Sequence, residues 1–501
     1  MCAIPAVDVS TLTRTTVEAF TVFELRKKQS ATYDPAMDNL RAGLTRAVDT
    51  IVEYREGLPA SRVAPVASRA SVREALGDLA DGPTPLDQVI DELISAASPG
   101  LMASAGPRYY GFVIGGSLDA ALVADVLTSG WDQCAYNVAL SPSAIAFEDV
   151  AGGWIKELLG LPSSASVGFA TGGQSANTVG LAAGRWQVLH QRGWDVGRDG
   201  LHGAPPIRVV VCAERHATID RSVRLLGLGE NAIVEVPPLP NGAMDTGALR
   251  AVLGDDPSVP TLVCAAAGNV NTGACDDMTA VVDAAHAVGA WVHVDGAFGL
   301  WAAASPRTAH LVRGVERADS WACDGHKWLN VPYDSGYAIC AYPEVHATAL
   351  AYTAAYLTGQ VAGREFGGGD FVPESSRRAR GFATWAALRS LGRSGVADLV
   401  DRCCEMARRF AERLDELEDV EVANDVVLNQ VLVRVGGSEL TNRLEHALQE
   451  DGTCWMGGTT WRDERLLRIS VSNGSTTADD VDRVVASIGR LRSELIERGF
   501  A

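Results

Sequence analysis

Four short runs rich in β-branched residues alternate with helical stretches between residues 165 and 340, and this alternation limits the possible folds more than any other feature. Such alternation is typical of an α/β unit with a mainly parallel sheet. Ligands of these sheets bind beyond the carboxyl ends of the strands, so we expect functional side chains directly after the runs. The four runs are IRVVVCAE (207–214), TLVCAAAG (261–268), WVHVDG (291–296) and SGYAICAY (335–342).

The regions on either side of this unit have different patterns. Residues 1–106 are mainly helical in pattern and contain an apolar stripe, which predicts burial of one helix against another surface. The stripe consists of Leu40, Leu44, Val48 and Ile51. We therefore expect an N-terminal helical segment over 1–106 and a large α/β domain over 107–390.

The last part of the chain, 391–501, is predicted to be a small α+β domain. It begins with a long amphipathic helix, VADLVDRCCEMARRFAERLDEL, and contains strand candidates at 429–435 and 465–473. Thr477 is placed to cap a closing helix.

Composition and charge limit the kinds of function. The chain has 501 residues, of which 47% are hydrophobic, so it can bury a large core in more than one domain. The formal charge, 43 − 62 = −19, disfavours nucleic acid or an anionic membrane as a partner and favours small-molecule chemistry.

Cysteine usage and the N-terminus favour a cytoplasmic protein. Ten cysteines occur without CxxC spacing, so neither a disulfide framework nor a zinc site is expected, and no metal is predicted. The N-terminus lacks a basic segment followed by an apolar one, and no uncharged apolar stretch of about 18 residues follows.

The most informative pair of residues is Asp295 and Lys327. Asp295 ends the strand candidate WVHVD, and Lys327 follows 327 − 295 = 32 residues later in the run DGHKW. A carboxylate at the end of a strand can keep a pyridine nitrogen protonated, and a partly desolvated lysine can bind a carbonyl cofactor covalently. Taken singly, an aspartate at a strand end is often only a turn former or a helix cap, and a lysine such as Lys327 is more often a surface residue, so the combination carries the prediction.

Two further features suit the same cofactor. The run ATGGQSANTVGLAAGR (170–185) places Gly172 and Gly173 before a helical stretch whose first N–H groups can bind a phosphate, although an ordinary glycine turn is as good an explanation. It lacks the spacing of a nucleotide-binding GxxxxGK[ST] loop. His216 follows the strand candidate at 207–214, where an imidazole can stack on a planar ring.

These residues make the sequence similar to the group II pyridoxal-phosphate-dependent decarboxylases, which include the aromatic-L-amino-acid and glutamate decarboxylases. The resemblance extends from about Pro107 to the end of the chain, and the ordered pair HVDGA…HKW is its most specific part. The matching pieces are YGFVIGGS (110–117), Ser141-Pro142 with Glu148, the Gly172-Gly173 loop, His216, HVDGA (293–297), His326-Lys327-Trp328 and LRISVSN (467–473).

The resemblance implies a fold-type I subunit that binds pyridoxal 5′-phosphate (PLP) and forms a homodimer. It implies that Lys327 holds the cofactor covalently, that Asp295 faces the pyridine nitrogen and that His216 stacks on the ring. It also implies that Ala297 packs on the other face and that Gly173, Gln174 and His326 hold the phosphate, although Gln174 replaces a smaller residue of the family.

The substrate residues are less specific. Arg468 falls where family members place an arginine near a substrate carboxylate, and a guanidinium suits a bidentate contact, but an arginine at a strand end is as often a surface residue. Phe112, Trp131 and Tyr136 suggest an apolar or aromatic substrate, although aromatic residues at these spacings are more often part of the core.

Two departures from the family pattern affect the chemistry. The family's Gly-Thr-Thr is replaced by a run in which Asn269 would contact the 3′-oxygen of the cofactor. The family also carries a tyrosine on a mobile loop, here 364–380, which protonates the carbon after CO₂ leaves, and its place falls at or near Gly368. Tyr352 and Tyr356 are upstream candidates for that role.

The expected reaction is α-decarboxylation of an L-amino acid to its amine, with decarboxylative aldehyde formation as a branch. An aminotransferase or a carbon–carbon lyase on the same fold is the alternative, because neither needs the missing tyrosine. A non-catalytic scaffold is disfavoured, because a scaffold needs none of Lys327, Asp295 and His216.

Overall fold

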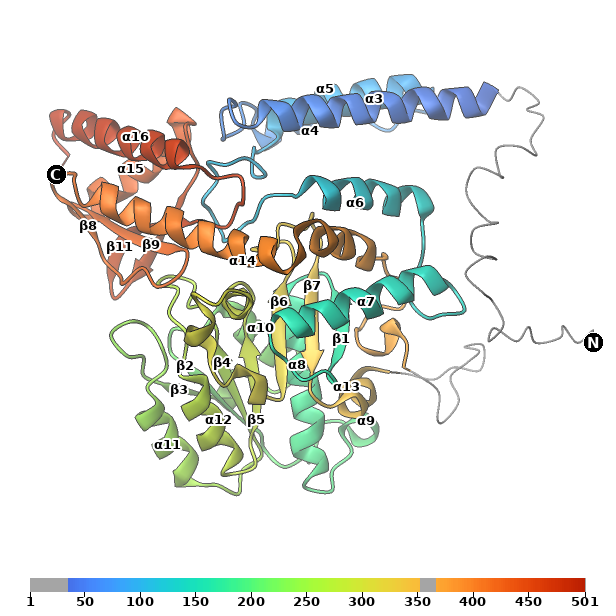
Figure 1. Cartoon of the computed structure of the whole chain (residues 1–501), viewed down its shortest axis with the longest axis vertical. Coiled ribbons are helices and arrows are strands. Elements are labelled where there is room, and N and C mark those ends of the chain that lie inside the picture. The colour runs from blue at the N-terminus through green and yellow to red at the C-terminus, as the bar shows by residue number, and fades with distance from the viewer. Residues whose placement is uncertain (1–34, 352–365, 501) are drawn as a thin grey trace, which may run out of the picture. The chain divides into compact units, whose positions relative to one another are not determined.

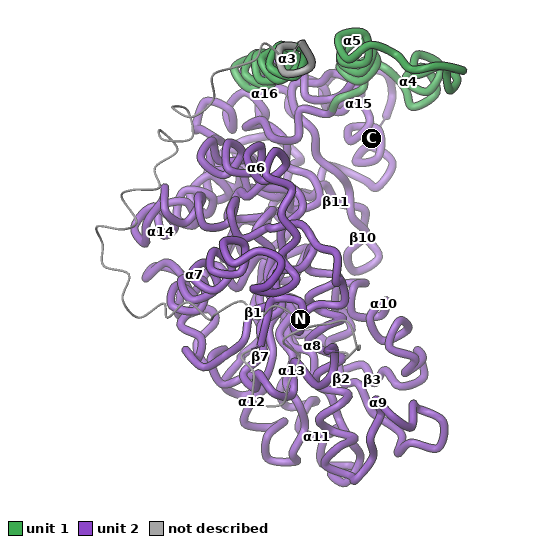
Figure 2. The backbone as a smooth tube through the Cα atoms, turned by 90° about the vertical axis from the view of Figure 1, so that its right-hand side faces the viewer, with its two compact units in different colours: residues 1–57, 66–101 green, residues 58–65, 102–501 purple. Residues whose placement is uncertain are grey.

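The computed structural model describes residues 35–351 and 366–500, and it confirms the predicted α/β fold. The chain divides into two compact units, one formed by residues 1–57 and 66–101 and the other by residues 58–65 and 102–501 (Figure 2). The finer division at residues 106 and 390 stays a prediction.

Within its described residues, the first unit contains the α-helices α3 (Pro35–Gly57), α4 (Arg69–Leu76) and α5 (Leu86–Ala97). The predicted apolar stripe lies on α3. Its residues Leu40, Leu44 and Val48 are 46%, 56% and 45% exposed, so the burial expected for the stripe is not found in the single chain.

The second unit is built around a seven-stranded sheet of order β1-β7-β6-β5-β4-β2-β3 (Figure 1). Strands β2 to β6 pair in parallel with their neighbours among themselves, whereas β7 runs antiparallel to both β1 and β6. The strands are β1 (Ser166–Ala170), β2 (Arg208–Cys212), β3 (Ile233–Val236), β4 (Thr261–Ala266), β5 (Trp291–Asp295), β6 (Ser320–Asp324) and β7 (Gly336–Cys340).

Helices cover this sheet on both sides (Figure 1). The long helix α8 packs against β5, β6 and β7, and buried small residues such as Gly180 and Gly184 allow that close approach. The α-helices of this part are α6 (Asp119–Trp131), α7 (Pro142–Leu158), α8 (Gly173–His190), α9 (Val196–Asp199), α10 (Ala217–Leu225), α11 (Thr246–Asp255), α12 (Met278–His286), α13 (Pro343–Leu350) and α14 (Gly381–Leu414).

A four-stranded antiparallel sheet of order β10-β11-β9-β8 forms the C-terminal part. The predicted strands at 429–435 and 465–473 correspond to β9 and β11, and Thr477 caps the closing helix as expected by accepting the Asp480 N–H. The elements are β8 (Val420–Val422), β9 (Gln430–Val435), α15 (Ser438–Asp451), β10 (Gly457–Trp461), β11 (Glu464–Ser470) and α16 (Ala478–Glu497).

The sequence pattern did not predict strands β1, β3, β6, β8 and β10. β6 matters most, because its short run SWACD ends at Asp324, three residues before Lys327. Among the described helices, none is both long and apolar enough to cross a membrane.

Candidate active site

A cavity of about 500 Å³ lies beyond the carboxyl ends of β2, β4, β5 and β6. Its lining includes eleven of the residues predicted for the site. They are Phe112, Gly172, Gly173, Gln174, His216, Asn269, Asp295, Ala297, His326, Lys327 and Arg468.

Trp131 is the predicted site residue that does not line this cavity. It is 51% exposed at the end of α6, and its ring packs edge to face on Phe382 with a centroid separation of 5.1 Å. Tyr136, in contrast, is buried, and it too does not line the cavity. Of the three aromatic residues that suggested an apolar or aromatic substrate, only Phe112 lines the cavity in the single chain.

Lys327 lies in the cavity beside a buried carboxylate. Its Nζ is 3.2 Å from Oδ2 of Asp324, which is only 1% exposed. The other oxygen of Asp324 accepts the N–H of Gly173 at 2.6 Å. Asp324 therefore joins the lysine to the start of α8, a role that the sequence could have indicated only if β6 had been recognised.

The glycine-rich run at 110–117 packs directly against the backbone of Lys327. A Cβ atom on Gly115 would lie 1.8 Å from the Lys327 carbonyl oxygen. The N–H of Gly115 donates to the His326 carbonyl at 3.4 Å. Glycine is therefore required at 115 for the lysine to hold its position.

Asp295 ends β5 with its carboxylate on the cavity. One oxygen accepts the Ala297 N–H at 3.3 Å, and the other accepts the Thr218 hydroxyl at 3.4 Å. No side chain in the described parts of the chain forms an ion pair with it. A protonated ring nitrogen would supply the missing positive partner.

His216 is held by the first turn of α10. Its Nδ1 accepts the Thr218 N–H at 3.3 Å, so the imidazole caps the helix. Burial lowers the pKa of His216, and the Asp295 carboxylate offsets only part of that effect. A neutral imidazole is suited to stacking on a planar ring without adding charge to it.

A buried chain of hydrogen bonds reaches Asp295 and His216 through Thr218. Thr218 accepts the Asn177 amide at 3.1 Å, and the Asn177 oxygen pairs with His293 Nε2 at 2.9 Å. Burial lowers the pKa of His293 to about 4, so this link is uncharged at neutral pH. Sequence reasoning missed Thr218 and Asn177, because they come from different elements and carry no local motif.

The start of α8 provides the predicted anion site in part. The first N–H groups of a helix have no intrahelical acceptor, and here those of Gln174 and Ser175 follow Gly173. A Cβ on Gly172 would lie 2.8 Å from the His326 ring, so glycine leaves the space between His326 and the start of α8 open. The Gln174 side chain points elsewhere, with its amide donating to Ser222 at 3.0 Å.

Asn269 lines the cavity but already uses its hydrogen-bonding groups. Its amide donates to Glu214 at 3.1 Å and to the Gly242 carbonyl at 3.2 Å. Its oxygen accepts the N–H of Asn271 at 2.8 Å. A contact to a cofactor oxygen would therefore require one of the amide hydrogens to change partner.

Arg468 reaches the cavity from β11 without an ionic partner. It donates to the Val270 carbonyl at 3.4 Å, and no carboxylate in the described parts of the chain pairs with it. Burial alone lowers its pKa. An unpaired, desolvated guanidinium is a strong site for a carboxylate.

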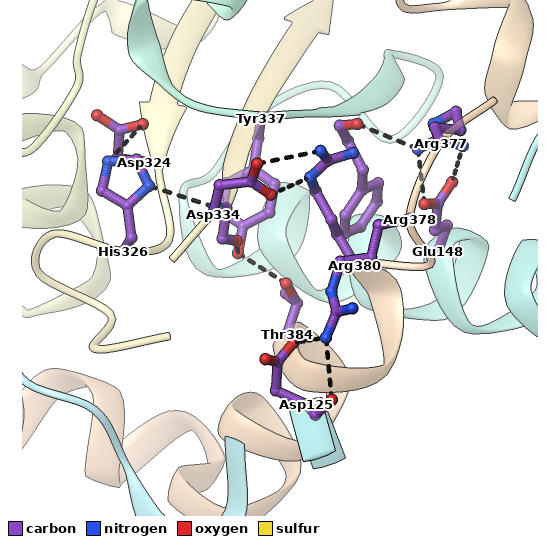
Figure 3. Close-up of polar contacts among 12 residues, drawn as sticks. Asp125, Glu148, Asp324, His326, Asp334, Tyr337, Arg377, Arg378, Arg380 and Thr384 are labelled. Atoms are coloured by element: carbon purple, nitrogen blue, oxygen red, sulfur yellow. Dashed lines mark hydrogen bonds and ion pairs between the residues drawn. The ribbon is translucent and has the colours of Figure 1, made fainter. Parts of the chain in front are cut away.

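Gly368 packs against the buried side chains of Glu148 and Arg377. Figure 3 shows these two side chains and the ion pair between them. Arg377 donates to Glu148 at 2.6 and 2.8 Å. A Cβ on Gly368 would lie 2.6 Å from Glu148 Oε2 and 2.7 Å from Arg377 Nη1. This backbone leaves no space for a tyrosine at 368, and Tyr352 and Tyr356 lie outside the described residues.

Gly368→Ala is expected to destabilise the fold by about 1–3 kcal/mol, because the added methyl group would displace a buried ion pair. The measurement is urea unfolding followed by tryptophan fluorescence. Gly153→Ala is the matched control, since nothing lies within 4 Å of a Cβ there and alanine favours the α7 helix. Equal stability of both variants would show that Gly368 packs differently.

Comparison with known proteins gives a consistent result. The family model described as the pyridoxal-dependent decarboxylase conserved domain matches residues 71–435. Tryptophan decarboxylase 1 of Oryza sativa subsp. japonica is 28% identical, over 89% of this chain and 92% of that protein. The 4-hydroxyphenylacetaldehyde synthase of Rhodiola rosea is 26% identical, over 91% and 95%.

A solved structure shares the fold. The crystal structure of Oryza sativa TDC with PLP and tryptamine superposes with a TM-score of 0.85 at 24% identity, covering 93% of this chain and 100% of that chain.

Proposed function

The chain belongs to the pyridoxal-dependent decarboxylase family, and from that membership we propose how its cavity removes the carboxyl group of an L-amino acid. It is a PLP-dependent carboxy-lyase. One observation carries the assignment of roles: a single cavity contains Lys327, Asp295 and His216 together with the unpaired guanidinium of Arg468. We propose the amine as the first candidate product.

The residues of the cavity fit the cofactor. Lys327 would bind it covalently, Asp295 would hold the proton at its ring nitrogen and His216 would stack on the ring. The N–H groups at the start of α8, with His326, would hold the phosphate. When bound, PLP accepts the electron pair that remains as the bond between Cα and the carboxyl group breaks.

Arg468 is proposed to bind and orient the substrate carboxylate. The guanidinium would hold the carboxylate at the angle at which its bond to Cα breaks, and the carboxylate would then leave as neutral CO₂. The lack of any other carboxylate partner for this guanidinium within the described residues supports the role.

Arg468→Gln is expected to lower kcat/KM about 100-fold, mainly through KM, because a buried charge-assisted contact to the substrate is lost. Steady-state CO₂ release measures the effect. Arg434→Gln is the control, since Arg434 lies on β9 and pairs with Glu421 and Glu464 outside the cavity. A purely structural Arg468 would instead lower stability and leave KM unchanged.

Decarboxylative aldehyde formation is the second candidate reaction, and the packing of Gly368 favours it. With no tyrosine at 368, the proton that completes an amine must come from another group. In the aldehyde reaction, the amino acid, O₂ and water yield aldehyde, CO₂, ammonia and hydrogen peroxide. The similarity to an aldehyde synthase of Rhodiola rosea supports this possibility.

We further propose a cytoplasmic homodimer. The exposed apolar stripe of α3 would be covered by a second copy of the chain, which fits its exposure in the single chain. All nine cysteines within the described residues are free thiols, which suits a reducing compartment. Aminotransfer and carbon–carbon cleavage have no specific support beyond the shared fold.

The test of the proposed function is to incubate the PLP-loaded protein with a panel of L-amino acids. CO₂ release, oxygen uptake and the mass of the organic product are followed together. CO₂ with an amine supports the first candidate, and CO₂ with an aldehyde, ammonia and oxygen uptake supports the second. Absence of CO₂ from every substrate would contradict both.

A further inference from the structure

We propose that Glu214 forms an acidic subsite that selects L-amino acids with a positively charged side chain. This inference rests on the proposed function of the cavity and names its substrate class. Glu214 follows β2, is partly buried and lines the same cavity as Lys327 and Arg468. Among the described residues, no positively charged group pairs with its carboxylate, and the proposed place of the cofactor gives it no positive partner either.

Neutral donors fix the orientation of this carboxylate. Its Oε2 accepts the Asn269 amide at 3.1 Å and the Trp461 indole N–H at 3.0 Å. No arginine, lysine or histidine in the described ranges forms an ion pair with Glu214. The carboxylate is therefore held in place while its negative charge remains available.

The positive groups nearby are directed elsewhere. Arg215, the next residue, pairs with Asp220 at 2.8 Å and with Glu235 at 2.7 Å. Arg468 contacts the Val270 carbonyl and does not pair with Glu214. The other cavity carboxylates have defined partners, since Asp324 pairs with Lys327 and Asp295 faces the place proposed for the ring nitrogen.

With Asp295 assigned to the ring nitrogen, the described lining of the cavity keeps two unpaired charges of opposite sign, the Arg468 guanidinium and the Glu214 carboxylate. An amino acid with a cationic side chain matches both, with its α-carboxylate at Arg468 and its side-chain ammonium at Glu214. An apolar side chain would displace water from the Glu214 carboxylate without supplying a positive charge, which disfavours binding. Charge complementarity of this kind selects among substrates.

A structural role for Glu214 makes a different prediction. Trp461 lies at the end of β10, so Glu214 also helps to anchor the β10–β11 hairpin beside the cavity. Glu214→Gln keeps an oxygen that can accept both hydrogen bonds and removes only the charge. The variant therefore separates the anchoring role from the proposed acidic subsite.

The experiment compares L-ornithine with L-norleucine, which carries a methyl group where ornithine carries its ammonium. In the PLP-loaded wild type, kcat/KM is expected to be at least about tenfold higher for ornithine, and Glu214→Gln should abolish that preference. Glu235→Gln is the control, because it removes a neighbouring negative charge outside the cavity and should leave the ratio unchanged.

A binding measurement gives an independent readout. Calorimetric titration with 1,4-diaminobutane and 1-pentylamine, the matching amines, should show tighter binding of the diamine to wild type and equal binding to Glu214→Gln. Unchanged preference in Glu214→Gln, or a wild type that prefers norleucine and pentylamine, would overturn the inference.

The proposed function and the acidic subsite can be contradicted separately. CO₂ released from aromatic or apolar amino acids, and not from ornithine, would overturn the acidic subsite while the proposed function stands. Absence of CO₂ from every amino acid, together with a diamine preference that depends on Glu214, would overturn the reaction and retain the subsite.

Discussion

Lys327→Ala is expected to lower the rate of CO₂ release by at least about 1,000-fold, because the variant loses both the covalent attachment of the cofactor and the amine that lies beside the reacting carbon. The visible absorbance of the bound cofactor and its trapping by borohydride should disappear together. Steady-state CO₂ release and the absorbance spectrum of the purified variant measure the two effects.

A second variant, Lys327→Arg, tests whether the effect comes from losing the contact between Lys327 and Asp324. Lys327→Arg keeps the positive charge beside Asp324 but cannot form the covalent bond, so it should preserve stability and still lose activity. Wild-type activity in either variant would show that the lysine is not part of the reaction.

Asp295→Asn is expected to lower kcat by about 1,000-fold, or about 4 kcal/mol of transition-state stabilisation, because an amide cannot keep the ring nitrogen protonated. The substitution preserves the side-chain shape and an acceptor for the Ala297 N–H. Cofactor content, measured by absorbance, should therefore fall much less than kcat.

Asp220→Asn serves as the control for this prediction. Asp220 lies on α10 and pairs with Arg215, away from the ring nitrogen's proposed place. Its kcat should stay within about twofold of wild type, as for surface substitutions away from a site. A normal kcat in Asp295→Asn would mean that the carboxylate only shapes the turn after β5.

The sequence predicted the central features of the fold because they depend on local patterns. The run WVHVD placed Asp295 at a strand end, and the structure has β5 ending at that residue. Thr477 before an acidic first turn predicted the start of α16. Runs of β-branched residues and capping signals of this kind need no knowledge of tertiary contacts.

Features that depend on contacts between distant segments could not be read in this way. Strand β6 has the sequence SWACD, which contains no β-branched residue, so its identity comes from pairing with β5 and β7. Asn269 donates a hydrogen bond to Glu214, and Gly368 packs on Glu148. Both contacts join residues more than 50 positions apart. Trp131 shows the reverse case, a plausible aromatic that the fold places outside the cavity.

The low lysine content makes the attachment site easy to identify. The chain has four lysines, Lys27, Lys28, Lys156 and Lys327. Lys156 donates to the carbonyls of Ser163 and Ala165 and does not line the cavity. A covalently trapped cofactor can therefore be assigned among very few candidates.

The most direct test of the central claim is borohydride reduction of the PLP-loaded wild-type protein, followed by protease digestion and mass spectrometry of the peptides. The account predicts a cofactor-mass adduct on the peptide that contains Lys327, and on no other. An adduct on Lys156, Lys27 or Lys28, or a cofactor that washes away unreduced, would contradict it.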